Sequence, residues 1–330
     1  MSRAAAPGAA VRGVAFGAAV KRQRGVALLA ALLAVALAVV LVAALLDRGE
    51  EVRMRTAHAL RAEQSWQLLR GLEGWAIKLL RDEESDIDSR ADLWARPLAP
   101  IEVPGGRVGG ALRELGGCFN LNSLGNYQGT DYSAAMLRRF QRLLAALRLD
   151  PGIAAAALDW VDPDVDPTTG GAEDMQYRVA APPYRAANRP FVHVSELRLV
   201  RGVDADTYAR LLPHVCVLPD EDTPMNLNTA SVELWMSLRD DITEGMARRL
   251  WLNGEARYDN AQLQAALLRE LRLPPESPLQ DAGLLAGVNT RYFVMRAEIQ
   301  ADGLPFLYSS LIDRAPTGGA RVLARVRGSW

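Results

Sequence analysis

The sequence predicts an α+β fold, in which one long N-terminal helix packs on an antiparallel sheet and a large all-α insertion interrupts that sheet. Three observations lead to this prediction. Residues 26–82 lack proline and carry apolar residues at near-helical spacing. Strand-like segments with Gly-rich turns lie near residue 110 and again near the C-terminus, and the pattern between them, over 125–285, is largely helical.

The long helix is predicted from about 26 to 82, with Gly49, Gly71 and Gly74 as places where it can bend. Its second half is amphipathic, so one face is expected to cover a globular domain. The first strands are expected at 101–103, 108 and 111–115, around a turn at Gly105-Gly106.

The C-terminal strands are expected at 290–300, 305–313 and 320–327, because these segments alternate and are rich in β-branched and aromatic residues. Turns at 301–303 and 317–319 separate them. A single sheet that is split by the helical region is the simplest layout that keeps these strands together.

Composition excludes several classes of protein. The 38 Lys and Arg residues against 39 Asp and Glu residues give a net charge of −1, which disfavours nucleic-acid binding by bulk charge. With 49% hydrophobic and 23% charged residues, the chain is not expected to be disordered. Two cysteines and three histidines do not make a Cys-rich zinc module, and no G-x-S-x-G or other catalytic constellation is present. The sequence therefore predicts a protein that is not an enzyme.

The N-terminal segment has the pattern of a membrane anchor. Residues 1–24 contain five basic residues and no acid, and Val26–Leu46 is an uncharged apolar run of 21 residues. At 1.5 Å per residue this run spans roughly 31 Å as a helix, enough to cross a bilayer core. The basic flank predicts a cytoplasmic N-terminus and an extracytoplasmic remainder. A cleaved signal peptide and a plain anchor are the two alternatives.

The junction Lys21-Arg22-Gln23-Arg24-Gly25 resembles the leader of type IV pilins and pseudopilins. The resemblance implies that a prepilin peptidase cuts between Gly25 and Val26 and that Val26 becomes an N-methylated first residue. It divides this region into a cytoplasmic leader, 1–25, and a transmembrane helix, 26–46. Most such subunits carry glutamate at the fifth mature position. Here that position is Ala30, as is typical of the K subunit of secretion pseudopilins.

An acidic stretch, residues 159–174, holds six carboxylates and no Lys or Arg. Hard oxygen ligands without His or Cys favour Ca²⁺, with Mg²⁺ second. The candidate ligands are Asp162, Asp164, Asp166, Glu173 and Asp174. An EF-hand is disfavoured, because Pro167 occupies the position that needs glycine. A solvated acidic turn is the alternative.

The helical region contains two short repeats and two hairpins. FNLNSL (119–124) and MNLNTA (225–230) each precede a helix, so helix capping is the simplest explanation of both. Helix–turn–helix units are expected at 195–212 and 230–250. They resemble helix-hairpin-helix modules, which bind phosphate through a glycine-rich hairpin. Here the first hairpin has a single glycine, and the second has no glycine and carries Asp240-Asp241, so phosphate binding is disfavoured.

Five motifs in order resemble the K subunit of type II secretion systems: GGCFNLNSL, LDWVDPDVDP, GAEDMQY, PPYRAANRPFVHVSELRLVRGV and PMNLNTAS. The resemblance spans most of residues 20–315. It implies a pilin-like helix and first strands over 47–124, a SAM-like or helix-hairpin-helix-like insertion with a calcium loop over 125–285, and C-terminal strands over 286–330.

The same resemblance implies a minor pseudopilin in the bacterial inner membrane, with its C-terminal domain in the periplasm. It implies a place at the tip of a periplasmic pseudopilus with the minor pseudopilins I and J, where the protein promotes assembly and export. No nucleic acid is expected as a partner. A DNA-uptake protein that uses the hairpins and a calcium-dependent scaffold with an ordinary anchor are the other classes left open.

Cys118 and Cys216 are the only two cysteines. In an oxidising periplasm they could pair and close a loop of about 100 residues, which would stabilise the fold by roughly 4–5 kcal/mol in the chain-entropy model. Two separately buried thiols are the alternative.

Overall fold

The computed structural model describes residues 23–83, 86–125, 130–274, 286–315 and 319–328. The chain divides into two units, residues 1–60 and 61–330, and each is described by itself. The leader up to residue 22 and most of the turn expected at 317–319 lie outside the described residues.

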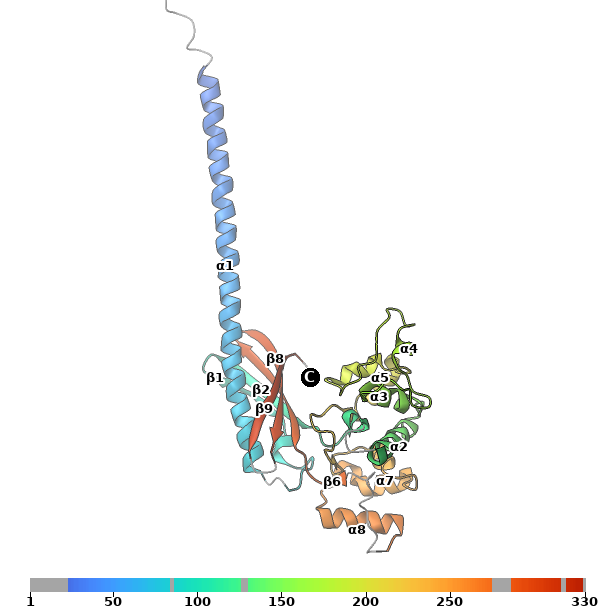
Figure 1. Cartoon of the computed structure of the whole chain (residues 1–330). Helices are drawn as coiled ribbons and strands as arrows, with labels where there is room; N and C mark the ends of the chain where they lie inside the picture. The colour runs from blue at the N-terminus through green and yellow to red at the C-terminus, as the bar shows by residue number, and fades with distance from the viewer. Residues whose placement is uncertain (1–22, 84–85, 126–129, 275–285, 316–318, 329–330) are drawn as a thin grey trace, which may run out of the picture. The chain divides into compact units, whose positions relative to one another are not determined.

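A single helix, α1 (Gln23–Asp82), runs from the first unit into the second (Figure 1). It is unbroken at Gly49, Gly71 and Gly74, where the sequence allowed a bend. In the first unit its side chains are almost all exposed, including Val26, Leu33 and Leu46. Its most apolar 18-residue window has a mean hydropathy of 3.1, so this helix is long and apolar enough to cross a membrane.

Five antiparallel strands form the main sheet of the second unit, in the order β1-β2-β7-β8-β9. The strands are β1 (Leu98–Val103), β2 (Gly106–Glu114), β7 (Tyr292–Ala301), β8 (Leu304–Arg314) and β9 (Ala320–Arg327). β2 and β7 are neighbours, although the whole insertion separates them in the sequence. The expected α+β class is confirmed. The six expected strand segments fall in these five strands, because 108 and 111–114 belong to the single strand β2.

The C-terminal part of α1 packs on one face of this sheet. Leu69, Leu72, Ala76 and Leu80 recur three or four residues apart and are at most 5% exposed, in one cluster with Phe293 and other sheet residues. Because every second strand residue faces the helix, β7 shows alternating burial from Met295 to Ala301, whereas its first residues, from Tyr292 on, are buried on both faces.

One carboxylate is buried in this helix–sheet interface. Glu73 of α1 is 3% exposed and accepts a hydrogen bond from Ser310 Oγ at 2.6 Å. Arg325 of β9 donates to both of its oxygens at 2.7 and 2.8 Å. This ion pair ties the edge strand β9 to the helix, because a buried charge is tolerated only when it is paired.

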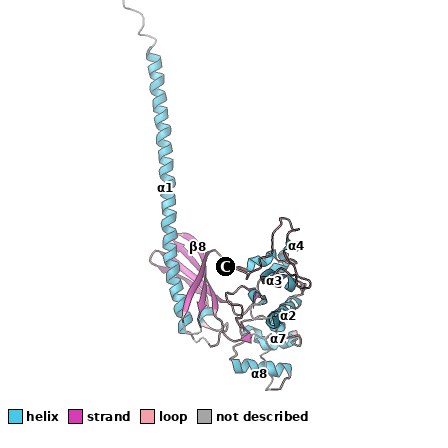
Figure 2. Cartoon of the chain, viewed as in Figure 1, coloured by secondary structure: helices cyan, strands magenta, loops and turns pink. Residues whose placement is uncertain are grey.

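The insertion is mainly helical and has its own core (Figures 1 and 2). Its longer helices are α2 (Thr130–Ala146), α3 (Ile153–Val161), α7 (Glu244–Trp251) and α8 (Asn260–Leu271). Its shorter elements are β3 (Phe119–Asn120), η2 (Leu121–Leu124), α4 (Asp174–Tyr177), η3 (Val194–Leu199), α5 (Ala205–Leu211), β4 (Val215–Cys216), β5 (Met225–Asn226), α6 (Val232–Ser237), η4 (Leu252–Gly254) and β6 (Ala286–Gly287). Outside the insertion, one short 3₁₀ helix, η1 (Leu93–Ala95), precedes the sheet.

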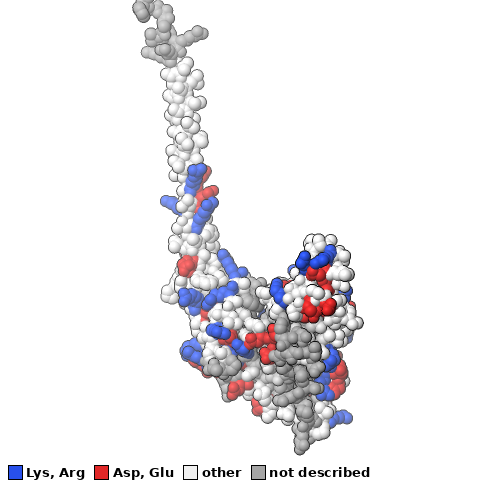
Figure 3. Space-filling model, in the orientation of Figure 1, with Lys and Arg blue, Asp and Glu red and all other residues white. Residues whose placement is uncertain are grey.

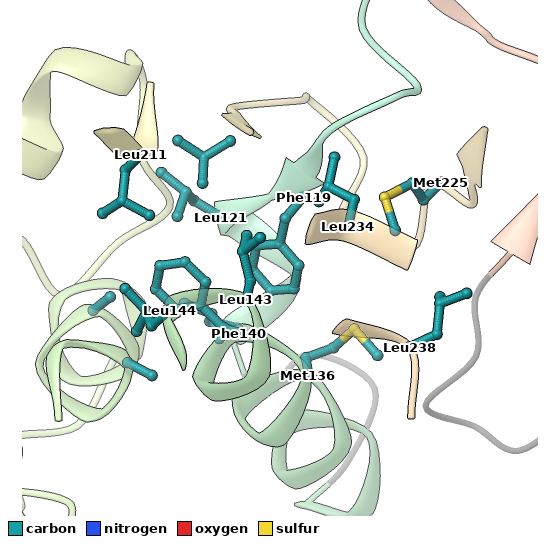
Figure 4. Packing of buried hydrophobic residues seen from close by; sticks show 14 of the residues in the cluster. Phe119, Leu121, Met136, Phe140, Leu143, Leu144, Leu211, Met225, Leu234 and Leu238 are labelled. Atoms are coloured by element: carbon teal, nitrogen blue, oxygen red, sulfur yellow. The ribbon is translucent and has the colours of Figure 1, made fainter. Parts of the chain in front are cut away.

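The core of the insertion draws on elements from its whole length. Figure 4 shows Phe119, Phe140, Leu144, Leu211 and Leu234 gathered around one centre, although they come from four different elements. The rings of Phe119 and Phe140 stack with centroids 5.0 Å apart.

The insertion is wider than the range 125–285 expected from the sequence. It begins after Glu114 of β2 and ends before Tyr292 of β7. The short strands near its two ends, β3 and β6, pair with other short strands of the insertion and not with the main sheet. β3 pairs with β4, and β5 pairs with β6, both in parallel.

The two NLN repeats do more than cap helices. Asn120 Oδ1 accepts from the backbone N–H of Asn122, as capping requires, and Asn226 Oδ1 does the same for Asn228. The second asparagine of each repeat then reaches a distant backbone. Asn122 accepts from Phe191 N and donates to Phe191 O, at 2.7 and 3.1 Å.

Asn228 repeats this pattern: it accepts from Tyr258 N and donates to Tyr258 O, at 2.7 and 3.0 Å. In both copies the contacted residue lies just before a capping box, at His193 and at Asp259. The insertion therefore consists of two halves that share one local design.

A buried polar cluster joins the sheet to the insertion. Arg314 of β8 donates to the Asp88 carboxylate, and both side chains are at most 5% exposed. Asp88 also accepts from Thr290 N at 2.6 Å, while Asn226 Nδ2 donates to Asp88 O and to Thr290 Oγ1, both at 3.1 Å. The second NLN repeat is thereby fixed to the base of the sheet.

Candidate metal site and processing junction

Three of the five predicted ligands come together. The carboxylates of Asp162, Asp164 and Glu173 each place an oxygen within 4.8 Å of the other two. Asp162 ends helix α3 as its C-cap, and Glu173 precedes α4 as its N-cap. The loop between these two short helices thus returns on itself, which brings residues eleven apart into one cluster.

The cluster is short of positive charge and of hydrogen-bond donors. Asp162 and Glu173 are only 7% and 3% exposed. No donor among the described residues reaches Asp162 Oδ1 or either carboxylate oxygen of Glu173. Burial, reinforced by the neighbouring Asp164, raises the pKa of Asp162 to about 7. Burial and the nearby Asp159 raise the pKa of Glu173 to about 7.

Asp159 is a fourth member of this cluster that the sequence reasoning did not select. It lies on α3, three residues before Asp162, and is fully buried. One of its oxygens accepts from Thr168 N at 3.1 Å, and the other has no donor among the described residues. Its closeness to Gly171 explains that glycine, because a Cβ there would lie 1.9 Å from Asp159 Oδ2. The sequence signal that could have identified Asp159 is its spacing of three residues from Asp162, which places both on one face of a helix.

The other two predicted ligands lie outside the cluster. Asp174 turns to two arginines, with Arg178 at 2.8 Å and Arg185 at 3.8 Å, and it accepts from Ala186 N. Asp166 is exposed, and its backbone N–H donates to Asp164 Oδ1 at 2.9 Å. Of the five candidate ligands, the structure therefore brings together only Asp162, Asp164 and Glu173, with Asp159 nearby.

This geometry is chemically suited to a hard divalent cation. Carboxylate oxygens that are buried and lack donors are costly unless a cation neutralises them. An all-oxygen set without His or Cys is the set that Ca²⁺ prefers. The loop is not an EF-hand, because α4 is a single turn and Asp166, its fifth position, does not join the cluster.

Cys118 and Cys216 form a disulfide, with an S–S distance of 2.09 Å. Of the two alternatives left open by the sequence, the structure contains the bridge. It lies beside the β3–β4 pair and packs with Leu115, Leu218 and Tyr292, where the sheet meets the insertion.

The two expected hairpins differ from the sequence prediction in detail. In the first, the leading helix is the 3₁₀ helix η3, and Gly202 between η3 and α5 has a positive φ of +87°. In the second, between α6 and α7, Asp240 pairs with Arg142 and Asp241 with Arg239, at 2.6 and 2.9 Å. These carboxylates are already neutralised, so their repulsion of phosphate is weaker than the sequence suggested. The absence of nucleic-acid binding stays a prediction.

The predicted processing junction, Gly25-Val26, lies at the start of α1. Gly25 and Val26 are both helical, and no other part of the described chain comes within 4 Å of a Cβ placed on Gly25. The helix that follows is free of charged residues up to Asp47, where a charged segment begins (Figure 3). Ala30 is exposed on this apolar helix.

Comparison with known proteins gives one consistent family. A family model described as type II secretion system (T2SS), protein K, matches residues 117–220. Type II secretion system protein K of Pseudomonas aeruginosa is 33% identical over 320 residues, which cover 93% of each chain. The chain belongs to the type II secretion system protein K family.

A second protein K, from Klebsiella pneumoniae, is 39% identical over 219 residues, 63% of this chain and 67% of that one. Among solved structures, a chain of the GspK-GspI-GspJ complex from enterotoxigenic Escherichia coli superposes with a TM-score of 0.69 at 24% identity. It covers 84% of this chain and 100% of that chain, so the two share their fold.

The matched segment, 117–220, coincides with the first half of the insertion. It contains the first NLN repeat, both cysteines, the acidic cluster and the first hairpin.

Proposed function

We propose that this member of the protein K family is a minor pseudopilin, which occupies the tip of a periplasmic pseudopilus with the minor pseudopilins I and J. In this role it promotes assembly of the pseudopilus and protein export across the outer membrane. It acts as a structural subunit and not as an enzyme. The observation that carries the proposal is the combination of one long helix on a five-stranded sheet with a large insertion, in a chain related to protein K over 93% of its length.

The size of the insertion supports a terminal position. It interrupts the sheet between Glu114 and Tyr292 and contains 14 of the 21 helices and strands assigned in the described residues. A subunit that adds such a bulk to the pilin-like core would obstruct the next subunit above it. Ala30 fits the same polarity, because it offers no carboxylate to a neighbour's N-terminus.

Immunogold labelling tests this position. A tagged full-length chain, expressed with the complete secretion machinery, is expected to appear at one end of each isolated filament and to co-purify with subunits I and J. Label along the filament length would contradict the tip position. An Ala30→Glu variant is expected to shift label into the filament body, with Ala31→Glu as the matched control.

We further propose that the chain is anchored in the inner membrane with a cytoplasmic N-terminus. Five basic residues precede the apolar helix, and acidic residues follow it. Prepilin peptidase would then cut between Gly25 and Val26, where the helix leaves the cytoplasmic interface. Intact mass and N-terminal sequencing of the protein from membranes test this: a methylated Val26 is expected, and an uncut chain would contradict it.

We also propose Ca²⁺ as the ligand of the acidic cluster. The support is the set of buried carboxylate oxygens of Asp162 and Glu173 that no donor among the described residues satisfies, with an oxygen of the exposed Asp164 within 4.8 Å of both groups. Calorimetric titration of the full chain in detergent should show calcium binding that is lost in Glu173→Gln and retained in Asp166→Asn. Equal loss in both variants would contradict the ligand set.

A further inference from the structure

A groove of about 260 Å³ lies where the end of β2 meets the insertion. Its walls are apolar and come from both parts: Val194 of η3, Leu212 after α5, and Val215 and Val217 in and after β4. Leu212 is 42% exposed at this groove, which is unusual for a leucine in a cleft. The one charged side chain in the lining is Arg113 of β2.

The side chain of Arg113 makes no hydrogen bond or ion pair within the part of the chain that the structure describes, although its backbone belongs to the β2–β7 ladder. The nearest carboxylate, Glu114, is already engaged: it accepts from the amides of Gly116 and Gly117 and from Thr290 Oγ1. The surrounding protein lowers the pKa of Arg113, because burial disfavours its charged form. The side chain is nevertheless reachable from solvent. A cation in this setting is suited to an incoming carboxylate.

The groove also presents a free strand edge. β4 pairs with β3 alone, in parallel, and Phe119 N donates to His214 O. In this register the backbone N–H and C=O groups of Val215 and Val217 point away from β3. No described residue hydrogen-bonds to the backbone of either valine outside the β3–β4 pair. Such an edge can pair with another extended chain.

We propose that this groove binds an extended peptide segment of a partner protein. The segment pairs with the free edge of β4, places an apolar side chain against Val194 and Leu212, and sets a carboxylate on Arg113. The strand edge favours a peptide over a fatty acid, since a hydrocarbon chain cannot use the backbone groups of Val215 and Val217. This inference does not depend on the tip position proposed above.

The test uses the full chain in detergent micelles and a library of N-acetylated pentapeptides. Their central residue is glutamate, and the other four positions are Val, Leu, Thr or Ser. Each bound peptide is compared by fluorescence anisotropy with its Gln counterpart and with a copy that is N-methylated on alternate amides. The variants are Arg113→Gln, Arg113→Lys and Arg296→Gln. The last is the matched control, because Arg296 is exposed on a neighbouring strand and does not line the groove.

The wild-type chain is expected to prefer the Glu peptides over the Gln peptides by about tenfold, as for a charge-assisted hydrogen bond. This preference should vanish in Arg113→Gln, survive in part in Arg113→Lys and persist in Arg296→Gln. N-methylation should abolish binding. The proposal is overturned if no peptide binds, if Arg113→Gln keeps the preference, or if dodecanoate displaces the peptides and binds more tightly than they do.

Discussion

Asn122 and Asn228 form the same hydrogen-bond pattern in two halves of the insertion. Each side-chain amide bonds to both the N–H and the C=O of one distant residue, Phe191 for Asn122 and Tyr258 for Asn228. Each also reaches a second carbonyl, of Leu218 and of Val288. In each half, a single asparagine side chain thus joins its own backbone segment to two others that are distant in sequence.

Replacing Asn122 by alanine is expected to lower the free energy of unfolding by about 2–4 kcal/mol, because three buried hydrogen bonds are lost and their backbone partners stay unsatisfied. Asn228→Ala should behave alike. Urea unfolding of the full chain in detergent measures the effect. The control is Asn289→Ala at an exposed position, expected to change it by less than about 0.5 kcal/mol. A small change at both buried sites would show that the repeats are caps only.

Removing the disulfide is expected to destabilise the protein strongly. The bridge closes a loop with a sequence separation of 98 residues, for which the chain-entropy model gives about 4–5 kcal/mol. The double variant Cys118→Ser/Cys216→Ser should lose about this much in urea unfolding. Reductant should lower the stability of the wild type to the level of the variant and leave the variant unchanged. A reductant effect on the variant would point to a cause other than this bridge.

Asp162→Asn is expected to have opposite effects with and without calcium. Burial raises the pKa of Asp162 to about 7, so the metal-free fold loses stability as the pH rises from the unfolded pKa of 3.8 through that value, and the loss is complete above it. In EDTA at pH 8 the variant should be at least about 1 kcal/mol more stable than the wild type. With about 1 mM calcium the order should reverse, because only the wild type binds the ion.

Thermal melts at both conditions, with Asp166→Asn as the control, measure this reversal. The control should follow the wild type throughout, because Asp166 lies outside the cluster. If Asp162→Asn is less stable than the wild type in EDTA as well, the buried carboxylate is not a destabilising group.

The contribution of His214 to stability is expected to fall on mild acidification, opposite in sign to that of Asp162 and Glu173 in the metal-free protein. Burial lowers the pKa of this imidazole, with Glu233 acting in the opposite direction, and its Nδ1 lies 2.9 Å from Ser231 Oγ, the N-cap of α6. A histidine whose folded pKa lies below its unfolded value takes up a proton more readily when unfolded. Its contribution is therefore present above about pH 6.5 and is lost as the pH falls below that value.

His214→Gln should therefore flatten the decline in the free energy of unfolding between pH 7.5 and 5.5, both about one unit from the unfolded pKa. His58→Gln, at an exposed position on α1, should leave the slope as in the wild type. Urea unfolding at the two pH values gives both slopes. Equal slopes in all three proteins would remove His214 as the source.

Most of the fold follows from local patterns. The apolar pattern over 26–82 predicted a long helix with an amphipathic second half, and the structure places Leu69, Leu72, Ala76 and Leu80 on the face that covers the sheet. The alternation over 290–300 predicted β7. The limits of the insertion could not be predicted, because β3 and β6 are two-residue strands whose partners lie far along the chain. Such pairs carry no periodic signal.

The sequence predicted the kind of residue in the candidate metal site, but not which of the carboxylates come together. Six carboxylates over 159–174 indicated a hard cation. Which of them meet depends on how the loop returns between α3 and α4, and on Arg178 and Arg185, which draw Asp174 away. Which carboxylate an arginine side chain contacts depends on the folded structure and cannot be read from the order of the residues.

The sequence by itself determined the apolar anchor, the long helix, the split sheet and the acidic loop, because each depends on neighbours within a few residues or on a regular period. Only the tertiary structure decided the pairing of Asn122 with Phe191, the membership of Asp159 in the cluster, and the groove beside Arg113. Each of these joins segments that are separate in sequence and come together only when the hydrophobic cores close around them.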